Sequence, residues 1–363
     1  MSDLALPSLP EGLSPGWMTS ALRHLGLLPP SVTVSALERQ QVGEGVGMMS
    51  ELSRLILTYD GDAGDLPTRF IAKYPSQNPT NRGVAMSFNL YEREVRYFAE
   101  LEPRTSAVSP RAYIAEIQGD NFLLLLEDLS DYRTGDQIQG ADLEDSAAAV
   151  AELAKLHAAF WNNVDDIDWI PHISNSYHAD NMQAGTAGGW RNMVDLFGEF
   201  LTDDIAALQP AFSAALPQLQ KDMDHAPITL IHGDYRMENF LFGTRPQHHQ
   251  LAIIDWQGPL LGKGMVDVAL VLGQSTRTDV RRAHERDLVK QYAADLRSLG
   301  VDYSFAQAWQ EYLAALLYNW CYVAVVSGTL DASNERAFAW MSQMVARQVA
   351  ATNDHGLAAR LVD

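Results

Sequence analysis

Two neighbouring segments of the sequence read His232-Gly233-Asp234-Tyr235-Arg236-Met237-Glu238-Asn239 and Ile253-Ile254-Asp255-Trp256-Gln257. They supply an aspartate, an asparagine and a second aspartate in the order that phosphoryl transfer from ATP to a hydroxyl requires. In that chemistry one carboxylate orients the attacking hydroxyl and accepts its proton. An amide oxygen and another carboxylate hold the magnesium ion that bridges the donor phosphates. Asp234, Asn239 and Asp255 can fill these three roles.

Short apolar runs lie around these polar residues, at 228–231, 240–242 and 251–254. Runs of this length between turn residues predict buried strands, so the two aspartates are expected at strand ends. Turn residues after the second run can fold it back on the third. Such a hairpin would bring Asp255 close to Asn239, although an isolated aspartate beside a glycine more often only caps a turn. The joint pattern favours one site built from both segments.

The two motifs resemble those of the aminoglycoside phosphotransferase and choline kinase-like group of small-molecule kinases, including its ecdysteroid kinase-like branch. The resemblance runs from about Gln40 to about Gly273 and is strongest in HGDYRMEN and IIDWQ. It implies an α+β, two-lobe protein-kinase-like fold. An N-terminal ATP-binding lobe, residues 1–129, would carry an antiparallel sheet and a helix. A larger, mainly helical lobe, residues 130–363, would carry the catalytic and acceptor-binding groups.

The resemblance also implies roles for single residues. Asp234 would be the catalytic base, and Asn239 and Asp255 would bind Mg²⁺. Arg236, two positions after the base, stands where related kinases place a cation against the transferring phosphate.

A glycine-rich turn lies between two β-favouring stretches, 32–42 and 50–59. Its glycines are Gly43, Gly45 and Gly47, and glycine allows a backbone to approach phosphate oxygens closely. The turn lacks the Lys-Ser/Thr ending of a Walker A loop and the spacing of a dinucleotide-binding fingerprint. A strand follows it instead of a helix, which fits a hairpin that covers the phosphates of ATP.

The next β-favouring segment, residues 69–74, places Lys73 after Ile-Ala, as in the kinase strand whose lysine contacts the α- and β-phosphates. The alternative for such a lysine is an edge position with its ammonium group in solvent. A helix predicted from about Arg82 to Leu101 should carry a glutamate that pairs with the lysine, and Glu92 and Glu94 compete for this role. Glu94 borders the apolar face of the helix and is favoured.

The apolar run at 122–126 predicts a buried strand that ends in a polar turn. By the resemblance, this segment connects the two lobes. Backbone groups of Glu127, Asp128 and Leu129 would then contact the edge of the adenine.

Further residues are expected to support the site. His232 and Gly233 would shape the catalytic loop, and Asp267 resembles the structural aspartate that braces that loop. His157 lies in a helix predicted over residues 143–161, and it is expected to be a packed structural histidine.

The chain has 363 residues, which is more than one compact core usually supports, so two lobes are expected. The single cysteine, Cys321, cannot form an intrachain disulfide and is expected to be buried, in a reducing cytoplasm. No basic, apolar leader opens the sequence, and the longest apolar stretch, 312–326, is shorter than the roughly 20 residues that span a bilayer. We expect a soluble cytoplasmic protein with no membrane partner.

The net charge of −20 argues against a nucleic-acid partner, because a polyanion would be repelled unless a local basic face existed. An acidic cleft could attract a cationic acceptor, but an acidic surplus is more often a solubility feature of the surface. His248-His249 lies in a polar turn without the three converging ligands of a catalytic zinc site.

The acceptor site is expected in the C-terminal region, roughly residues 143–363. Residues 161–190, with glycines at 185, 188 and 189, predict an irregular loop beside the acceptor. The sequence therefore predicts an ATP- and Mg²⁺-dependent kinase that acts on a small-molecule hydroxyl acceptor whose identity, like the oligomeric state, it does not indicate. The alternative is a nucleotide-binding scaffold or regulator without turnover. A protein kinase would need a longer activation segment.

Overall fold

The computed structural model describes residues 5–7, 10–42 and 49–361, and the chain divides into two compact units. Unit 1 consists of residues 1–104, 109–130 and 255–257, and unit 2 consists of residues 105–108, 131–254 and 258–363. The predicted lobes, 1–129 and 130–363, are each one continuous segment. In the structure, residues 105–108 belong to unit 2 and residues 255–257 belong to unit 1. The predicted phosphate-covering glycines, Gly43, Gly45 and Gly47, lie outside the described residues.

Within the described residues, unit 1 is built on a five-stranded antiparallel sheet in the order β1-β2-β3-β5-β4, which confirms the predicted antiparallel sheet. Its strands are β1 (Thr33–Val42), β2 (Ser50–Asp60), β3 (Arg69–Pro75), β4 (Ala112–Gln118) and β5 (Asn121–Glu127). Lys73 of β3 lies opposite Leu52 on one side and Leu124 on the other. Lys73 therefore belongs to an interior strand, which excludes the edge position.

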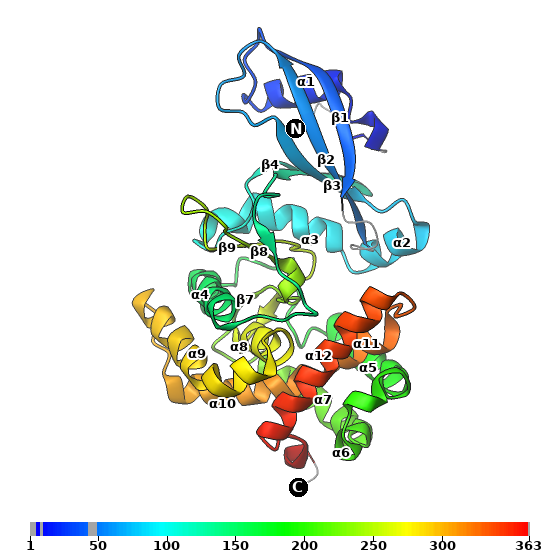
Figure 1. Ribbon diagram of the computed structural model, residues 1–363, viewed down its shortest axis with the longest axis vertical. Helices are drawn as coiled ribbons and strands as arrows, with labels where there is room; N and C mark the ends of the chain where they lie inside the picture. Colours follow the sequence, from blue (N-terminus) through cyan, green and yellow to red (C-terminus); the bar gives the residue numbers. More distant parts are fainter. Residues whose placement is uncertain (1–4, 8–9, 43–48, 362–363) are drawn as a thin grey trace. The chain divides into compact units, whose positions relative to one another are not determined.

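The two faces of this sheet have different partners. Leu123 and Leu125 of β5 pack into the apolar cluster that helix α1 (Pro15–His24) closes on one face (Figure 1). Neighbouring side chains of a strand point to opposite faces of the sheet, so Phe122 lies on the other face from Leu123. Its ring contacts the ring of Tyr91, with centroids 4.6 Å apart. Burial on both faces explains the uninterrupted apolar run of this strand.

The prediction of a single helix over residues 82–101 is wrong. The chain forms α2 (Pro79–Ser87) and α3 (Leu90–Arg96), and a short π-helix, Tyr97–Leu101, continues α3. Asn89, between the two helices, has a φ of 53°. This left-handed conformation interrupts a regular helix, and asparagine adopts it more readily than most residues.

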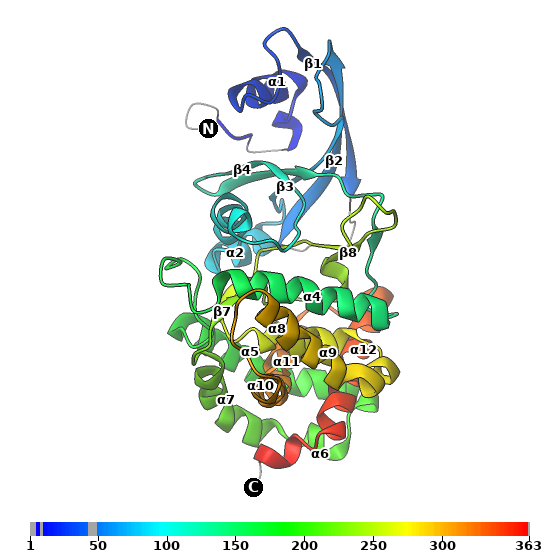
Figure 2. The same cartoon turned by 90° about the vertical axis from the view of Figure 1, so that its left-hand side faces the viewer.

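Unit 2 is mainly helical. Its helices are α4 (Leu143–Phe160), α5 (Ser176–Phe197), α6 (Asp203–Ala206), α7 (Gln209–Met223), α8 (Met265–Leu270), α9 (Thr278–Ser298), α10 (Phe305–Tyr318), α11 (Trp320–Thr329) and α12 (Glu335–Asp354). Its short strands are β6 (Arg133–Thr134), β7 (Thr229–Ile231), β8 (Phe240–Phe242), β9 (Leu251–Ile253) and β10 (Leu260–Gly262). Phe240 of β8 lies opposite Ile253 of β9, which confirms the predicted hairpin. Helix α4 packs against α9 (Figure 2).

The irregular loop predicted over residues 161–190 is wrong from residue 176 onward, where the chain forms α5. Asn175 begins this helix by accepting hydrogen bonds from backbone amides of its first turn. The glycines that suggested a loop lie inside the helix, and two of them serve packing. A Cβ atom at Gly185 would lie 2.9 Å from a methyl carbon of Val325, and one at Gly189 would lie 2.4 Å from the carbonyl oxygen of Ala324.

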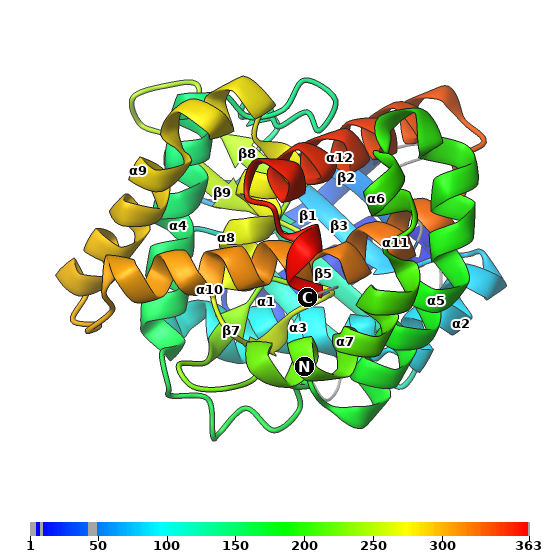
Figure 3. The same cartoon turned by 90° about the horizontal axis from the view of Figure 1, so that it is seen from below.

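Glycines thus allow α5 and α11 to lie in backbone contact (Figure 3). From the other side of the contact, a Cβ atom at Gly328 would lie 2.0 Å from the carbonyl oxygen of Gly189. A side chain at either position would push the two helices apart. At Gly188 the Cβ position is open, since no described atom lies within 4 Å.

Helices α10 and α11 follow each other with one residue, Asn319, between them (Figure 3). Together they cover Phe305–Thr329, a stretch of 25 residues that could cross a membrane by length and composition alone. However, 72% of its most apolar window is buried inside the structure, as in the core helix of a soluble protein. Cys321 belongs to this stretch and is buried, as predicted.

Gly189→Ala is expected to destabilise unit 2, because the new methyl group must displace the backbone of α11. We expect a loss of about 1–3 kcal/mol, measured as a lower Tm in thermal unfolding. Gly188→Ala is the matched control. Its methyl group meets open space and alanine favours a helix, so Tm should stay the same or rise. Equal effects of the two substitutions would contradict the packing described for Gly189.

Candidate active site

The loop of residues 232–239 leaves β7 through a turn that requires glycine. Gly233 has a φ of +80°, and a Cβ atom there would lie 2.3 Å from the carbonyl oxygen of Gly258. Both the backbone conformation and the space exclude a side chain. Met237–Asn239 then form a short 3-10 turn that leads into β8. The His-Gly-Asp motif therefore encodes a backbone shape as well as side chains.

A buried carboxylate fixes the start of this loop. Asp267 of α8 accepts hydrogen bonds from the backbone amides of His232, at 2.6 Å, and Gly233, at 3.1 Å. The imidazole of His232 lies 3.1 Å from the carbonyl oxygen of Ile254 through Nε2, and its Nδ1 accepts the amide hydrogen of Asp234 at 3.3 Å. Asp267 thus braces the loop, as predicted from the resemblance.

His157 has a structural environment, in agreement with the sequence. It is fully buried on α4, and its Nδ1 lies 2.7 Å from the hydroxyl oxygen of Tyr292. Its Nε2 lies 3.6 Å from a carboxylate oxygen of Asp267. The histidine therefore packs behind the residue that braces the loop.

A second buried group supports the end of the loop. The side-chain oxygen of Gln137 accepts hydrogen bonds from the amide of Met237, at 3.2 Å, and from the hydroxyl of Ser275, at 2.9 Å. Arg347 of α12 donates to the carbonyl oxygens of Gln137 and Ile138, at 2.6 and 2.9 Å. Burial lowers the pKa of Arg347 to about 10. This arginine therefore serves as a donor to backbone carbonyls.

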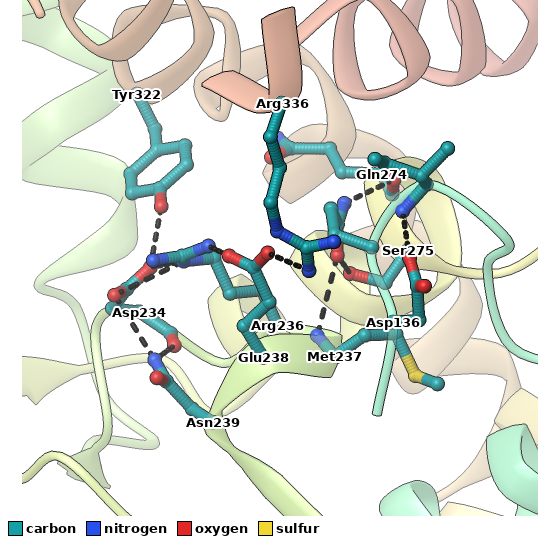
Figure 4. Close-up of polar contacts among 12 residues, drawn as sticks. Asp136, Asp234, Arg236, Met237, Glu238, Asn239, Gln274, Ser275, Tyr322 and Arg336 are labelled. Atoms are coloured by element: carbon teal, nitrogen blue, oxygen red, sulfur yellow. Dashed lines mark hydrogen bonds and ion pairs between the residues drawn. The ribbon is translucent and has the colours of Figure 1, made fainter. Parts of the chain in front are cut away.

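The Asp234 carboxylate, predicted as the base, is surrounded by donors (Figure 4). Arg236 Nε lies 3.0 Å from Oδ1, and Asn239 Nδ2 lies 3.0 Å from Oδ2. Asn239 Nδ2 also donates to the backbone carbonyl of Asp234 at 2.8 Å. The hydroxyl of Tyr322, on α11, donates to Oδ1. The Asp234 side chain is nevertheless 30% exposed, so it can be reached from outside.

Arg236, predicted to face the transferring phosphate, is held by acidic groups. Its Nη1 donates to Glu238 Oε2, and its guanidinium lies 5.0 Å from the centre of the Trp340 ring. Glu238 also pairs with Arg336 of α12 at 3.3 Å. Burial acts to lower the pKa of Arg236, but the neighbouring Asp234 and Glu238 carboxylates outweigh it and hold that pKa above its usual value.

In unit 1, Lys73 pairs with two carboxylates. Its Nζ donates to Glu94 at 2.7 Å and to Asp255 at 2.8 Å. Glu94 is therefore the partner of Lys73, whereas Glu92 lies 3.5 Å from Arg96 on the outside of α3. Burial acts to lower the pKa of Lys73, but the two carboxylates outweigh it and raise that pKa. Burial, only partly opposed by Lys73, raises the pKa of Glu94 to about 7.

Asp255, predicted as a metal ligand, has a strained backbone conformation, and the two residues that follow it make fixed contacts. Its φ of 66° lies in the left-handed region, where non-glycine residues are uncommon outside turns and functional sites. Trp256 is buried and stacks on Tyr97 with ring centroids 3.7 Å apart, and its indole donates to Ser109. Gln257 donates to the hydroxyl of Ser50 at 3.1 Å. The Asp-Trp-Gln motif thus fixes Asp255 in unit 1.

The predicted adenine-contacting segment lies at the end of β5. The Glu127 amide already donates to the carbonyl oxygen of Arg111, at 2.8 Å, so it is engaged within the sheet. The Asp128 carboxylate pairs with Arg54 at 2.8 Å and accepts the Ser130 amide. Leu129 follows, half-buried. Polar side chains of this segment therefore hold its shape.

The donor set fits Mg²⁺, a hard cation that prefers oxygen ligands. Asn239 directs its amide nitrogen to Asp234, which turns its side-chain oxygen away from that residue and makes it available as a ligand. Asp255 offers a carboxylate. Within the described ranges, no three His, Cys, Asp or Glu side chains gather as a metal site. Each of the two units therefore offers one oxygen ligand of the kind that Mg²⁺ takes.

Sequence reasoning missed three residues of this site: Tyr322, Glu238 and Arg336. Glu238 lies inside the motif, and its spacing of two residues from Arg236 was the available signal. Tyr322 lies 88 positions from Asp234, and Arg336 lies 98 positions from Glu238. No local pattern could have assigned these two, because only the folding of α11 and α12 brings them to the loop.

The family model of the ecdysteroid kinase-like proteins matches residues 44–301, well over half of the chain. A search of the curated proteins finds no match.

Several solved structures share the fold. Choline kinase from Cryptosporidium parvum Iowa II aligns with a TM-score of 0.56 at 11% identity, covering 95% of this chain and 99% of that one. A microcompartment-associated aminopropanol kinase gives 0.53 at 16% identity, with 95% and 99% covered. Wild-type aminoglycoside 2'-phosphotransferase-IIIa, solved with GDP, gives 0.51 at 13% identity, with 94% and 98% covered. These likenesses show a two-lobe kinase-like fold.

Glu94 should make stability depend on pH. Because its pKa of about 7 in the fold exceeds the usual 4.5, the folded state keeps a proton that the unfolded state loses between about pH 4.5 and 7. This contribution to stability is complete below about pH 4.5 and is lost as the pH rises through 7. Between pH 5 and pH 8, wild type should lose stability relative to Glu94→Gln, by on the order of 2 kcal/mol in the free energy of unfolding. We expect this loss to appear as a fall of a few °C in the Tm of wild type relative to that of the variant.

Glu92→Gln is the matched control for this experiment, because Glu92 lies exposed on the same helix. It should keep the pH dependence of wild type. A difference in Tm between wild type and Glu94→Gln that stays constant over this range would contradict the environment described for Glu94.

Asp267→Asn should weaken the brace of the loop. The substitution replaces one acceptor oxygen by a donor, so one of two buried backbone amides loses its partner. We expect a loss of about 1–3 kcal/mol, seen as a lower Tm. Asp195→Asn, at an exposed position in the same unit, should leave Tm unchanged. An unchanged Tm in Asp267→Asn would show that the loop does not depend on this carboxylate.

Proposed function

The chain belongs to the ecdysteroid kinase-like family, and we propose that it transfers the γ-phosphoryl group of ATP to a hydroxyl group of a small-molecule acceptor. One observation carries this proposal. The 232–239 loop holds an ordered aspartate and asparagine, and unit 1 holds a buried lysine that pairs with two carboxylates. Phosphoryl transfer depends mainly on positioning and charge compensation, and these are the groups that supply both.

We assign Asp234 to the acceptor hydroxyl. The carboxylate is reachable, and its hydrogen bonds fix its direction before any substrate arrives. It would orient the hydroxyl and take up its proton as the new oxygen–phosphorus bond forms. The bond that breaks joins the γ-phosphorus to the bridging oxygen, which leaves as the terminal oxygen of ADP.

We assign Lys73 to the phosphates that leave. Glu94 holds the lysine in a buried position, so its charge is presented without further rearrangement. Asn239 and Asp255 would hold Mg²⁺, which when bound offsets the negative charge of the phosphate oxygens. Glu127, Asp128 and Leu129 are proposed to line the adenine through their backbone.

Arg236 is proposed to face the transferring phosphoryl group. Its guanidinium already pairs with Asp234 and Glu238, so a phosphate would have to compete with Glu238 for it. This pairing keeps the arginine close to the base while its charge is neutralised.

The comparisons leave the acceptor open. The names of the solved relatives refer to choline, aminopropanol and aminoglycosides, which differ widely in size. One relative was solved with GDP, so both ATP and GTP should be offered to this protein as donors.

Substitutions separate the roles of the two aspartates. Asp234→Asn should reduce turnover by at least about 10³-fold while Kd for Mg-ATP stays within about twofold, because Asp234 faces the acceptor. Asp255→Ala should raise Kd for Mg-ATP at least about tenfold, because it removes a metal ligand and a partner of Lys73. Calorimetric titration measures both affinities.

Asp195→Asn, at its exposed position, serves as the control and should match wild type in both measurements. Equal losses of Mg-ATP affinity in Asp234→Asn and Asp255→Ala would contradict the assigned roles. Intact affinity without turnover in the wild type would favour the nucleotide-binding scaffold.

A further inference from the structure

The hydroxyl of Tyr322 donates to the carboxylate that we assign as the base, from a helix outside the motif (Figure 4). We propose that Tyr322 is a positioning residue that occupies Oδ1 of Asp234 and leaves Oδ2 as the oxygen that takes the acceptor proton. This inference rests on the proposed function, and it adds a residue and an atom to it.

The two carboxylate oxygens differ in their partners. Oδ1 accepts from Tyr322 and, at 3.0 Å, from Arg236 Nε, so both of its lone pairs are used. Oδ2 accepts from Asn239 Nδ2 at 3.0 Å and also from Arg236 Nε at 3.3 Å, which is the longer branch of a bifurcated hydrogen bond. Among the described residues, Oδ2 is therefore held by one short hydrogen bond and by the weaker branch of a second, and an acceptor hydroxyl can replace that weaker branch more readily than the contacts of Oδ1.

Tyr322 is suited to this role because it donates without adding charge. Burial and the adjacent Asp234 carboxylate raise the pKa of the Tyr322 hydroxyl well above its usual value, so the phenol keeps its proton. A second cation in this place would stabilise the ionised carboxylate more strongly and make it a weaker base. A neutral donor fixes the direction of Oδ1 at a smaller cost in basicity.

The position of Tyr322 is itself fixed. Helix α11 lies in backbone contact with α5 at Gly189 and Gly328. At its start, Asn319 donates to the carbonyl oxygen of Val266 at 3.1 Å, and Trp320 is fully buried. Tyr322 follows two residues later. Its hydroxyl is therefore delivered by a rigid helix, which gives it a defined direction that a loop residue would lack.

Charged groups around Asp234 come from the loop and from α12. Arg236 lies on the loop, and its Nη1 donates to Glu238, which in turn pairs with Arg336 of α12. This leaves Nε as the contact of Arg236 with Asp234 in the structure. Tyr322, on α11, adds a neutral donor to these charged groups. Loss of its hydroxyl would let the carboxylate turn toward the guanidinium of Arg236.

The test compares Tyr322→Phe with Tyr303→Phe at saturating nucleotide and acceptor. Tyr303 is the matched control, because its buried hydroxyl also donates to a carboxylate of unit 2, Glu311, at 2.7 Å. We expect kcat of Tyr322→Phe to fall about 10- to 100-fold with KM for Mg-ATP within about twofold. Tyr303→Phe should keep the kcat of wild type.

Crystal structures of wild type and Tyr322→Phe supply a readout that does not depend on turnover. We expect the Asp234 carboxylate to rotate about its Cβ–Cγ bond toward Arg236 in the variant. An unmoved carboxylate, or a kcat equal to or above that of wild type, would overturn the proposal. A higher kcat would show instead that Tyr322 blocks the place of the acceptor hydroxyl. If wild type transfers no phosphoryl group, the proposed function fails, and the position of the carboxylate still decides the role of Tyr322.

Discussion

The hydrogen bonds from two consecutive backbone amides to the Asp267 carboxylate are the constraint on which the candidate site depends. A buried charge is costly unless donors satisfy it, and the amides of His232 and Gly233 do so at the point where the chain leaves β7. The left-handed Gly233 makes both amides available to one carboxylate. Asp234 follows directly, so its direction is set by a residue that lies 33 positions away and makes no contact with substrate in the proposed mechanism.

The buried pair of Lys73 and Glu94 is maintained at a cost in stability. Lys73 serves two carboxylates, and the raised pKa of Glu94 shows that burial of this group is not fully offset by the lysine. Asp234 in unit 2 is likewise held by an arginine, an amide and a phenol. A buried ion pair such as that of Lys73 and Glu94 contributes little net stability, but it holds its partners in a defined geometry. Nucleotide and acceptor would therefore meet groups that are already positioned.

Local patterns predicted much of this protein. The hairpin of β8 and β9 followed from short apolar runs, whereas the antiparallel sheet and the bracing role of Asp267 were implied by the family resemblance that one loop motif carries. Predictions failed where packing outweighs composition. The glycines of α5 suggested a loop, but they serve a close contact between helices, and a single left-handed asparagine divides the helix predicted over residues 82–101. Tyr322 could not be predicted, because its relation to Asp234 exists only once α11 has packed.

We propose that Asp234 directs phosphoryl transfer to a hydroxyl. The most direct measurement incubates purified wild type and Asp234→Asn with Mg²⁺, ATP or GTP and a pooled library of hydroxylated small molecules, and detects the gain of one phosphoryl group by mass spectrometry. We expect a gain in one acceptor class with wild type and none with the variant. The same gain with both proteins, or none with wild type although nucleotide binds, would contradict it.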